Sequence, residues 1–586
     1  MSRKARKRSM MNTIDRKLFY KKILLTVIFL ISCMSVFSME IFACTAIYAG
    51  SSVTANGSTY MGRSEDFGPD YVKQFLIIPA ADHKHGECFK DDYGFKAPFP
   101  SHTLRYSVIM DDPSNYGGFT KTPFAEAGVN EKGVSVSATL STYFNKKVLK
   151  ADPLTANGIS EISMASYILQ SAENARKGVE ILAECIDTYG HGNPDTGNPD
   201  NCEVSTVLIA DRKETWVFEI LSGHQYIATR LSDDKVSVLP NDIMTQQINV
   251  SQENVIASDG IISTAKAGGF YVSNIKGDDE IHIAKSYSQG YEASSSYRFY
   301  YGAFILNRGL AESIDVVPQP VKNLADLYPN ASVEKAAKGL FYLQYLPSND
   351  MKGTIDLMTL RTVLASHGEG TPYETSSQNE NTKGEPMRSI GTYKQNEEHI
   401  FEIRKDPSIP LPLATVEWLA MGPSEFSLYV PFYSGAMTET PAVYRTNTLK
   451  SADLDSVYWL FNEIGNAGNG NYYHVDKDGV YHDRYGKVID TVTAKAVLKH
   501  LTDKVWVEEI RQFMKETQKE VYDKFSLDDK KIIELAKTSS DKGVSKIANK
   551  HARENAELIK KIAAKKLSEI DKNVDEYIRQ IGGGLN

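Results

Sequence analysis

The chain has 586 residues, 41% of them apolar and 24% charged, and these ordinary values exclude wholesale disorder and allow a large hydrophobic core. Its formal net charge is −8, but residues 1–43 contain nine Lys or Arg residues against two acidic ones. Without that segment 57 basic and 72 acidic residues remain, a net charge of −15 that argues against nucleic acid or an anionic membrane surface as the main partner.

The first 43 residues have the pattern of a secretory signal peptide. A basic stretch ends at Lys22, 17 uncharged residues follow from Ile23 to Met39, and the small residue Ala43 completes a cleavage site. A membrane anchor that stays attached is the alternative, although 17 residues are at the short limit for a span and no stop-transfer charges follow. We therefore expect cleavage after residue 43, contact with a membrane only through this leader, and an exported chain that is extracellular or associated with the cell envelope.

The next part of the chain has strand patterns interrupted by helical ones. From Cys44 to about residue 300, short runs with apolar residues at alternate positions are separated by Gly, Asn and Asp, which predicts antiparallel strands. Apolar residues recur at helical spacing over 160–188 and again from about 330 to 370. This order of strands and helices indicates an α+β protein in which helices cover sheets.

The C-terminal third ends in charged helices. We expect a polar loop over 371–400, further strands over 412–445, and helices from about residue 490 whose charge runs are solvated faces. The expected domains are therefore a signal peptide (1–43), a sheet-and-helix domain (44–490) and a helical C-terminal region packed on the core (491–586).

Cysteine and histidine residues give little sign of a disulfide scaffold or a metal site. Five cysteines are few for an exported protein, and Cys185 and Cys202 bracket the loop "IDTYGHGNPDTGNPDN", which a disulfide could close. The tract "HKHGEC" at 83–88 contains metal-ligand residue types, but no second ligand cluster accompanies it. We predict no metal and no other cofactor.

Cleavage between Ala43 and Cys44 would make a cysteine the first residue of the mature chain. That residue would carry both a nucleophilic thiol and an α-amine, and an α-amine titrates at about 7.7–8.0, close enough to neutral pH to take the thiol's proton and return it to a leaving amine. This is the chemistry of N-terminal-nucleophile hydrolases. Two alternatives remain: Cys44 is a small buried residue of a first strand, or "IFAC" is a lipobox in which the same cysteine is lipidated and its amine acylated.

A hairpin is predicted to bring charged residues next to Cys44. "CTAIYAG" and "TYMGRSED" read as strands, and the segment between them contains Asn56-Gly57, a strong turn signal. Such a hairpin would place Arg63 and Asp66 opposite Cys44, where Arg63 could stabilise a thiolate or a negative substrate group and Asp66 could orient the protonated α-amine. Without the cysteine, "RSED" would read as an exposed, charged strand end.

At these residues the sequence resembles the bacterial cysteine dipeptidase family typified by dipeptidase A, within the N-terminal-nucleophile hydrolases. The similarity covers most of the chain after residue 44, and the matching text is "CTAIYAGSSVTANGSTYMGRSED", "GVNEKGVSVSAT", "ETWVFEILSGHQYIATRLSDDKVSVLPND", "HGEGTPYE", "EPMRSIGTY" and "EWLAMGPSEFSLYVPFYSG". The resemblance implies a four-layer αββα core and the hydrolysis of short peptides, chiefly dipeptides, without a metal. It leaves the formation of a homo-oligomer open.

The resemblance also implies roles for individual residues. Cys44 matches the family nucleophile, and Arg63 and Asp66 match the Arg and Asp beside it in the wider group that includes penicillin V acylase and bile salt hydrolase. Asn241, in "LPND", falls where that group has an oxyanion-hole Asn, since a side-chain amide can stabilise the charge of a tetrahedral intermediate. Arg298, in "SSSYRFYY", matches a second active-site arginine that would bind substrate.

One part of the pattern differs from the wider group. Those enzymes carry an Asn near the position of Leu140, whereas Thr139 is the nearest polar side chain here, so the second oxyanion donor is open between Thr139 and a backbone N–H. Two other functions also remain: an amidase that acts on non-peptide amides, and a lipidated surface protein with a binding role.

Overall fold

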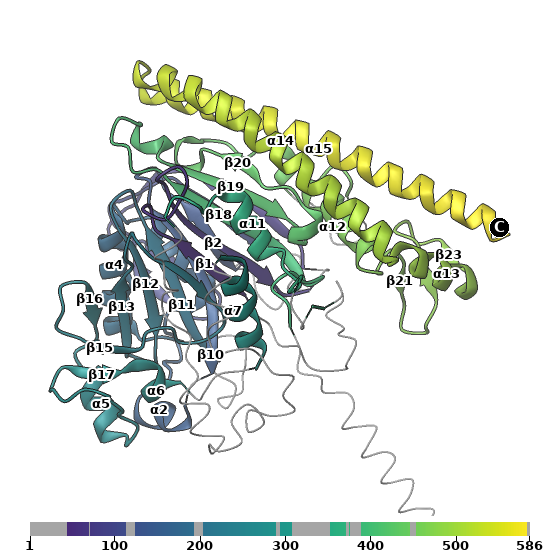
Figure 1. Ribbon diagram of the computed structural model, residues 1–586. Coiled ribbons are helices and arrows are strands. Elements are labelled where there is room, and N and C mark those ends of the chain that lie inside the picture. The colour runs from purple at the N-terminus through teal and green to yellow at the C-terminus, as the bar shows by residue number, and fades with distance from the viewer. Residues whose placement is uncertain are drawn as a thin grey trace, which may run out of the picture. The chain divides into compact units, whose positions relative to one another are not determined.

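Two antiparallel β-sheets and a long helical C-terminal region make up the part of the chain that the computed structural model describes (Figure 1). The described residues are 44–68, 71–112, 124–143, 145–192, 203–288, 293–306, 352–370, 374–375, 388–445 and 453–582. The predicted signal peptide and Cys202 lie outside them, whereas Cys185 carries a free, buried thiol. The prediction of an α+β chain with a helical C-terminal region is confirmed.

The first sheet carries the predicted hairpin. Among the described residues it has six strands, in the order β14 (Val236–Leu239), β1 (Thr45–Ala49), β2 (Thr59–Asp66), β18 (Gln395–Ile403), β19 (Thr415–Met421) and β20 (Val430–Phe432). All neighbouring strands are antiparallel, and β1 pairs with β2 so that Ala46 lies opposite Arg63. Gly57, in the predicted turn between them, has a φ of 72°, a conformation that favours glycine.

The second sheet has eight strands within the described ranges. Their order is β16 (Val255–Ala257), β13 (Tyr226–Arg230), β12 (Thr215–Ile220), β11 (Glu203–Ala210), β10 (Ser135–Tyr143), β9 (Ala125–Val129), β8 (Tyr106–Asp111) and β3 (Lys73–Ile78), again antiparallel. Smaller sheets are separate from these two. The two-stranded ones are β15 (Gln247–Asn249) with β17 (Glu280–His282), β4 (Ala81–Asp82) with β7 (His102–Thr103), and β5 (Cys88–Lys90) with β6 (Lys96–Pro98). A three-stranded one consists of β21 (His474–Val475), β22 (Tyr481–His482) and β23 (Val488–Ile489).

Alternation along the strands produces two apolar cores. In β11, Leu208 and Ala210 belong to a core that also contains residues of the six-stranded sheet, whereas Val207 and Ile209 belong to a second core with residues of two helices. These helices are α3 (Glu161–Leu169) and α4 (Ala175–Tyr189), which contact β9 to β12. Because successive side chains of a strand point to opposite faces, the eight-stranded sheet has the first sheet on one face and helices on the other.

Helices also contact the six-stranded sheet. α7 (Ala293–Leu306) contacts β14, and α11 (Leu357–Leu364) contacts α7 and β2. α12 (Val457–Gly468) contacts β19, and α15 (Asp541–Gln580) contacts β20, α12, α13 (Thr491–Leu501) and α14 (Lys504–Lys537). Within the described ranges the remaining helices are α2 (Lys146–Ala151), α5 (Ile261–Ala267) and α6 (Ile283–Tyr287), with 3-10 turns η2 (Leu411–Leu413), η3 (Ser424–Phe426), η4 (Ser434–Ala436) and η5 (Ala442–Tyr444).

The C-terminal helices α14 and α15 lie side by side (Figure 1). The buried residues of α15 recur every three or four positions, as in Val544, Ala548 and Ala552, which is the spacing of one helix face. α14 is joined to the sheet region through Gln518, whose fully buried amide accepts from the Tyr429 N–H at 2.7 Å and donates to the Tyr429 carbonyl at 3.0 Å. No helix among the described residues is both long enough and apolar enough to cross a membrane.

Several local predictions were wrong or incomplete. The helix predicted over 160–188 is two helices, because the turn before Asn174 interrupts it and the Asn174 side chain caps α4 by accepting from the Lys177 N–H. The loop predicted over 371–400 ends earlier, because β18 begins at Gln395. α7 lies in a stretch expected to contain strands, and part of the helix predicted over 330–370 falls outside the described residues.

Candidate active site

Cys44 immediately precedes β1 and is 7% exposed. Because Ala46 lies opposite Arg63, alternation along β1 puts Cys44 on the same face of the sheet as the Arg63 side chain. Arg63 Nη2 donates a hydrogen bond to Cys44 Sγ at 3.5 Å, and Nη1 donates to the Ala138 carbonyl in β10 at 2.5 Å. The predicted proximity of Arg63 to Cys44 is therefore present in the structure.

Burial and charge act in opposite directions on the Cys44 thiol. Burial raises its pKa, and the positive charge of Arg63 lowers it, but the net direction is upward. The carboxylates of Glu65, Asp66 and Glu161 raise it further. The thiol therefore needs a nearby base or additional positive charge to become a nucleophile at neutral pH.

A second arginine holds the backbone of Cys44 from the side of α7. Arg298 is fully buried, and its Nη1 donates to the Cys44 carbonyl oxygen, to Thr45 Oγ1 at 3.0 Å and to Asn241 Oδ1 at 2.7 Å. Asn241 follows β14, the strand that pairs with β1 on the side opposite β2. The contact to Oδ1 orients the Asn241 amide, with its nitrogen as the donor end. The structure thus brings Arg298 and Asn241 together at Cys44.

Asp66, the last residue of β2, is close enough to Cys44 for its charge to raise the pKa of the thiol. It is buried, and its Oδ2 accepts from Arg388 Nη2 at 2.8 Å. Burial raises the pKa of Asp66 to about 6, although the positive charges of Arg388, Arg298 and Arg63 each lower it. Arg388 was not predicted as a site residue, but it stands in the matching segment "EPMRSIGTY".

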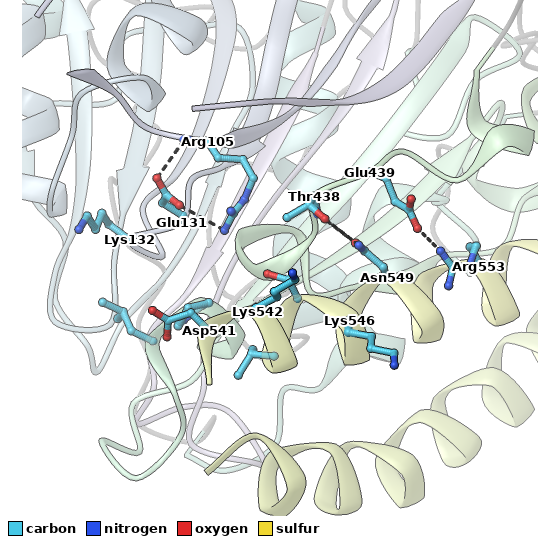
Figure 2. A pocket seen from close by; sticks show the side chains of 14 residues that line it. Arg105, Glu131, Lys132, Thr438, Glu439, Asp541, Lys542, Lys546, Asn549 and Arg553 are labelled. Carbon is cyan, nitrogen blue, oxygen red and sulfur yellow. Dashed lines mark hydrogen bonds and ion pairs between the residues drawn. The ribbon is translucent and has the colours of Figure 1, made fainter. Parts of the chain in front are cut away.

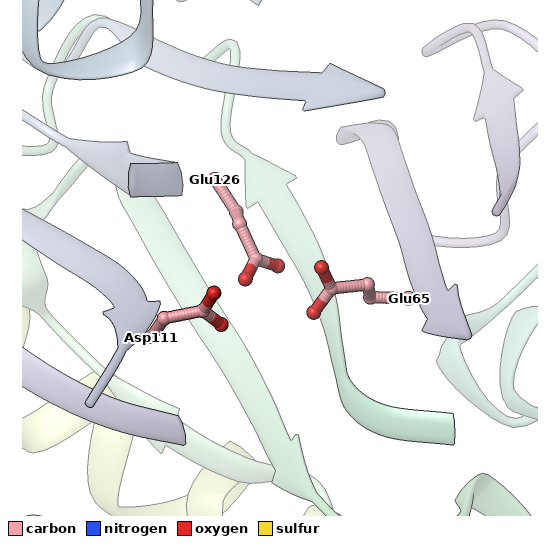
Figure 3. A group of neighbouring side chains, drawn as sticks. All are labelled: Glu65, Asp111 and Glu126. Carbon is pink, nitrogen blue, oxygen red and sulfur yellow. The ribbon is translucent and has the colours of Figure 1, made fainter. Parts of the chain in front are cut away.

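A buried ionic cluster that the sequence did not predict adjoins Arg63. The carboxylates of Glu65, Asp111 and Glu126 come from β2, β8 and β9, and Figure 3 shows them pointing toward one another. One oxygen of each lies within 4.8 Å of the others, a spacing that could hold a cation. Lys73 Nζ makes ion pairs with all three, so an ammonium group already supplies a positive charge there.

The only sequence signal for this cluster is a charged residue in an apolar strand. Glu126 stands in "FAEAGV" and Lys73 begins "KQFLII", where polar residues of these types are rarely buried without partners. Counted from Glu65, Lys73 is 8 positions away in the sequence and Glu126 is 61 positions away. Because these separations follow no regular pattern, spacing alone could not reveal the cluster. The cluster is important for the site because Arg63 Nη2, the atom that donates to the Cys44 sulfur, lies 3.3 Å from Glu126 Oε2.

β18 brings further charged groups to the same region. In "QNEEHIFEI" all nine residues are buried, and His399 Nδ1 lies 3.0 Å from Glu397 Oε2 while Nε2 lies 2.9 Å from Ser137 Oγ in the second sheet. The first part of this strand was predicted as loop because most of its side chains are polar. It is instead a central strand, between β2 and β19, and Glu397 and His399 find their partners between the two sheets.

Thr139, one candidate for the second oxyanion donor, stands in the strand that contacts Arg63. The Arg63 contact with the Ala138 carbonyl brings the segment of β10 that contains Thr139 next to the guanidinium group at Cys44. Thr139 is 5% exposed. Thr139, the side-chain candidate from the sequence, is therefore on a strand that adjoins the site.

A cavity of about 810 Å³ lies elsewhere, between the N-terminal part of α15 and loops of the sheet domain (Figure 2). Its lining includes the ion pairs Arg105–Glu131 and Glu439–Arg553 and a hydrogen bond between Thr438 and Asn549. None of Cys44, Arg63, Asp66, Asn241 and Arg298 lines it. The cavity and the cluster at Cys44 are therefore separate features.

Comparison with known proteins relates this chain to peptidases. The model described as Peptidase family C69 matches residues 43–483, a segment that begins one residue before Cys44. A protein of Streptococcus pyogenes described as "Probable dipeptidase B" is 32% identical over 557 residues, which cover 94% of this chain and 98% of that protein. Proteins described as "Probable dipeptidase" from Salmonella dublin and Latilactobacillus sakei are 30% and 26% identical over 68% and 74% of this chain, and 82% of each relative is covered.

The matched segment spans three quarters of the sequence and contains both sheets and every residue described above at Cys44. A thiol beside a guanidinium group, with an amide and a second arginine at its backbone, is chemically suited to a cysteine-type peptidase. The chain belongs to Peptidase family C69.

Proposed function

We propose that this peptidase is exported and hydrolyses dipeptides or other short peptides with Cys44 as an N-terminal nucleophile. The observation that carries the proposal is the pair of arginine contacts at Cys44, in which Arg63 donates to the sulfur and Arg298 to the carbonyl oxygen. The names of the relatives support dipeptides as substrates. The two facing sheets with helices on their outer faces are compatible with the αββα fold of N-terminal-nucleophile hydrolases.

In this proposal, removal of residues 1–43 frees the α-amine of Cys44. The amine takes the thiol proton, and the resulting thiolate attacks the carbonyl carbon of the scissile peptide bond. The Asn241 amide and one further donor stabilise the oxyanion. The protonated amine then gives its proton to the leaving amine as the C–N bond breaks, which leaves a thioester on Cys44. Water attacks the thioester with the same amine as base, and the second product leaves as a carboxylic acid.

The neighbouring residues have distinct roles in this sequence of steps. Arg63 stabilises the thiolate, since its positive charge lowers the pKa of a thiol that burial has raised. Asp66 orients the α-ammonium group. Arg298 positions Cys44 and Asn241 by its hydrogen bonds to both, and any contact it makes with substrate would be additional.

The position of the free amine can be tested by one added residue. A chain that begins at Cys44 is compared with a chain that has a single Gly before Cys44, which turns the amine into an amide and moves the free amine by one residue. We expect the added Gly to lower kcat/KM for a dipeptide by about 10²–10⁴-fold, the contribution of a general base. Cys44→Ala should abolish turnover in both forms, and similar circular dichroism spectra serve as the control for folding. Equal activity of the two chains would refute the N-terminal-nucleophile mechanism.

A mass measurement of the secreted protein tests the earlier steps. Intact mass and N-terminal sequencing should give a free cysteine at position 44, whereas a lipidated cysteine would be heavier by hundreds of daltons, as the added acyl chains require. A panel of dipeptides and acylated amines distinguishes a peptidase of short peptides from an amidase of non-peptide substrates. Retention of residues 1–43 on the active protein would contradict export by signal cleavage.

A further inference from the structure

Lys73 lies at the centre of the buried ionic cluster next to Arg63. It is the first residue of β3, pairs in register with Asp111 of β8, and is 1% exposed. Burial by itself would lower the pKa of Lys73, but the neighbouring carboxylates raise it well above its ordinary value. The side chain therefore carries its positive charge permanently in the interior of the protein, where a lysine is found only with compensating partners.

The partners of Lys73 connect it to the nucleophile. Nζ contacts Glu65 Oε2, Asp111 Oδ1 and Glu126 Oε1. The other oxygens of two of these carboxylates face Arg63 Nη2, with Glu126 Oε2 at 3.3 Å and Glu65 Oε1 at 3.7 Å. The same Nη2 donates to Cys44 Sγ.

Two carboxylates are therefore shared between a lysine and the arginine that contacts the sulfur. With Lys73 present, Glu65, Asp111 and Glu126 face two cations. Without Lys73, Glu65 and Glu126 would face Arg63, and the attraction of a guanidinium group to carboxylates in a buried site is far stronger than its hydrogen bond to sulfur. Arg63 would then be neutralised by, or drawn toward, the carboxylates.

We propose that Lys73 is a positioning residue of the peptidase site, which holds Glu65 and Glu126 so that Arg63 remains against the Cys44 sulfur and its charge remains available to the thiolate. The inference rests on the proposed role of Cys44 as nucleophile. Lys73 thereby influences the acidity of the Cys44 thiol through Glu65, Glu126 and Arg63, without contacting the sulfur itself.

Other charged groups also face this arrangement. From β18, Glu397 acts on Arg63 but is paired with His399, and from α3 Glu161 acts on Cys44. Asp66, whose charge also acts on Cys44, is paired with Arg388. None of these groups is substituted in the test below, although the charge of Lys73 also acts on Glu397 and lowers its pKa.

The pH dependence of Cys44 alkylation measures this effect without requiring turnover. In the full chain, the rate of reaction with iodoacetamide is followed by mass spectrometry of the peptide that contains Cys44, as a function of pH. Lys73→Met should slow alkylation near neutral pH by about tenfold, equivalent to a rise of about one unit in the thiol pKa. Lys73→Arg should largely restore the rate. Lys177→Met, which removes one charge from an exposed position on α4, is the matched control and should change nothing.

A paired substitution guards against misfolding of Lys73→Met. Asp111→Asn alone leaves Lys73 and Arg63 facing Glu65 and Glu126, whereas Asp111→Asn with Lys73→Met leaves Arg63 alone with them and removes one buried charge of each sign. We expect the alkylation profile of the double variant to lie at higher pH than that of Asp111→Asn. Coincident profiles, or a wild-type profile for folded Lys73→Met, would overturn the inference. Turnover by Cys44→Ala would instead refute the proposed function and leave the alkylation result valid.

Discussion

Replacement of Asp66 by Asn should remove a specific pH dependence of stability. Burial raises the pKa of this carboxyl group from an ordinary 3.8 to about 6 in the folded protein. Because the folded-state pKa is higher than the unfolded one, protonation favours the folded state. The contribution of this group to stability is fully present below its unfolded pKa and is lost as the pH rises through about 6. The amide introduced by Asp66→Asn does not titrate, so the variant lacks this contribution at every pH.

The size of the effect follows from the shift in pKa. About two pKa units at 1.36 kcal/mol each correspond to roughly 3 kcal/mol over the full titration. Between about pH 7.5 and about pH 4.5 the group passes through most of that range, which amounts to about 2 kcal/mol. The free energy of unfolding of wild type relative to Asp66→Asn should therefore rise by about 2 kcal/mol as the pH falls over this interval. The difference between the two proteins at a single pH also contains the loss of the Arg388 ion pair, so only its change with pH is diagnostic.

Urea unfolding at four pH values between about 4.5 and about 7.5 would measure this change. The chain with one Gly before Cys44 is the appropriate protein, because its Cys44 nitrogen is an amide, as it is in the structure. Parallel curves of unfolding free energy against pH for wild type and Asp66→Asn would refute the assignment of a raised pKa to Asp66. In a chain that begins at Cys44 the α-ammonium group should lower the pKa of Asp66, so the same comparison should give a smaller change if Asp66 binds that group.

Two further substitutions test other parts of the structure. Arg298→Lys keeps the positive charge but cannot reproduce the several hydrogen bonds that the guanidinium group makes at Cys44. We therefore expect the free energy of unfolding, measured with urea, to fall by about 2–4 kcal/mol, and kcat/KM for dipeptide hydrolysis to fall at least tenfold. Gln518→Leu leaves the Tyr429 N–H and carbonyl without partners and should destabilise the protein by about 2–4 kcal/mol in thermal or urea unfolding. The matched control Gln512→Leu, at an exposed position of the same helix, should change stability by less than about 0.5 kcal/mol.

The hairpin at Cys44 could be predicted because its determinants are local. Strand alternation and the Asn56-Gly57 turn fix the register, and the register places Arg63 beside Cys44. The C-terminal helices were predictable for a similar reason, since one face of each carries apolar residues at helical spacing. α7 was missed because "ASSSYRFYYGAFIL" is apolar and aromatic on most sides, and such a run does not distinguish a buried helix from a buried strand.

The contacts of Asn241 and Arg298 could not be derived from spacing. They meet at Cys44 only because α7 packs on β14 while β14 pairs with β1, and neither contact leaves a local pattern in the sequence. The resemblance to a family supplied both residues. It did not supply Lys73 or Arg388, which interact with other protein groups and enter the site indirectly.

The polar composition of β18 shows why sequence patterns fail in this region. An inner strand that is buried on both faces is expected to be apolar, but Glu397, Glu398 and His399 of β18 are polar and fully buried. Burial raises the pKa of Glu398 well above its ordinary value, and the negative charge of Glu397 acts in the same direction. An apolar residue of similar size would be more stable there. Buried acids and bases are concentrated on β2, which pairs with β1 beside Cys44, and on β18, the next strand of the sheet, as expected where a fold sets the charge around a reactive group at some cost in stability.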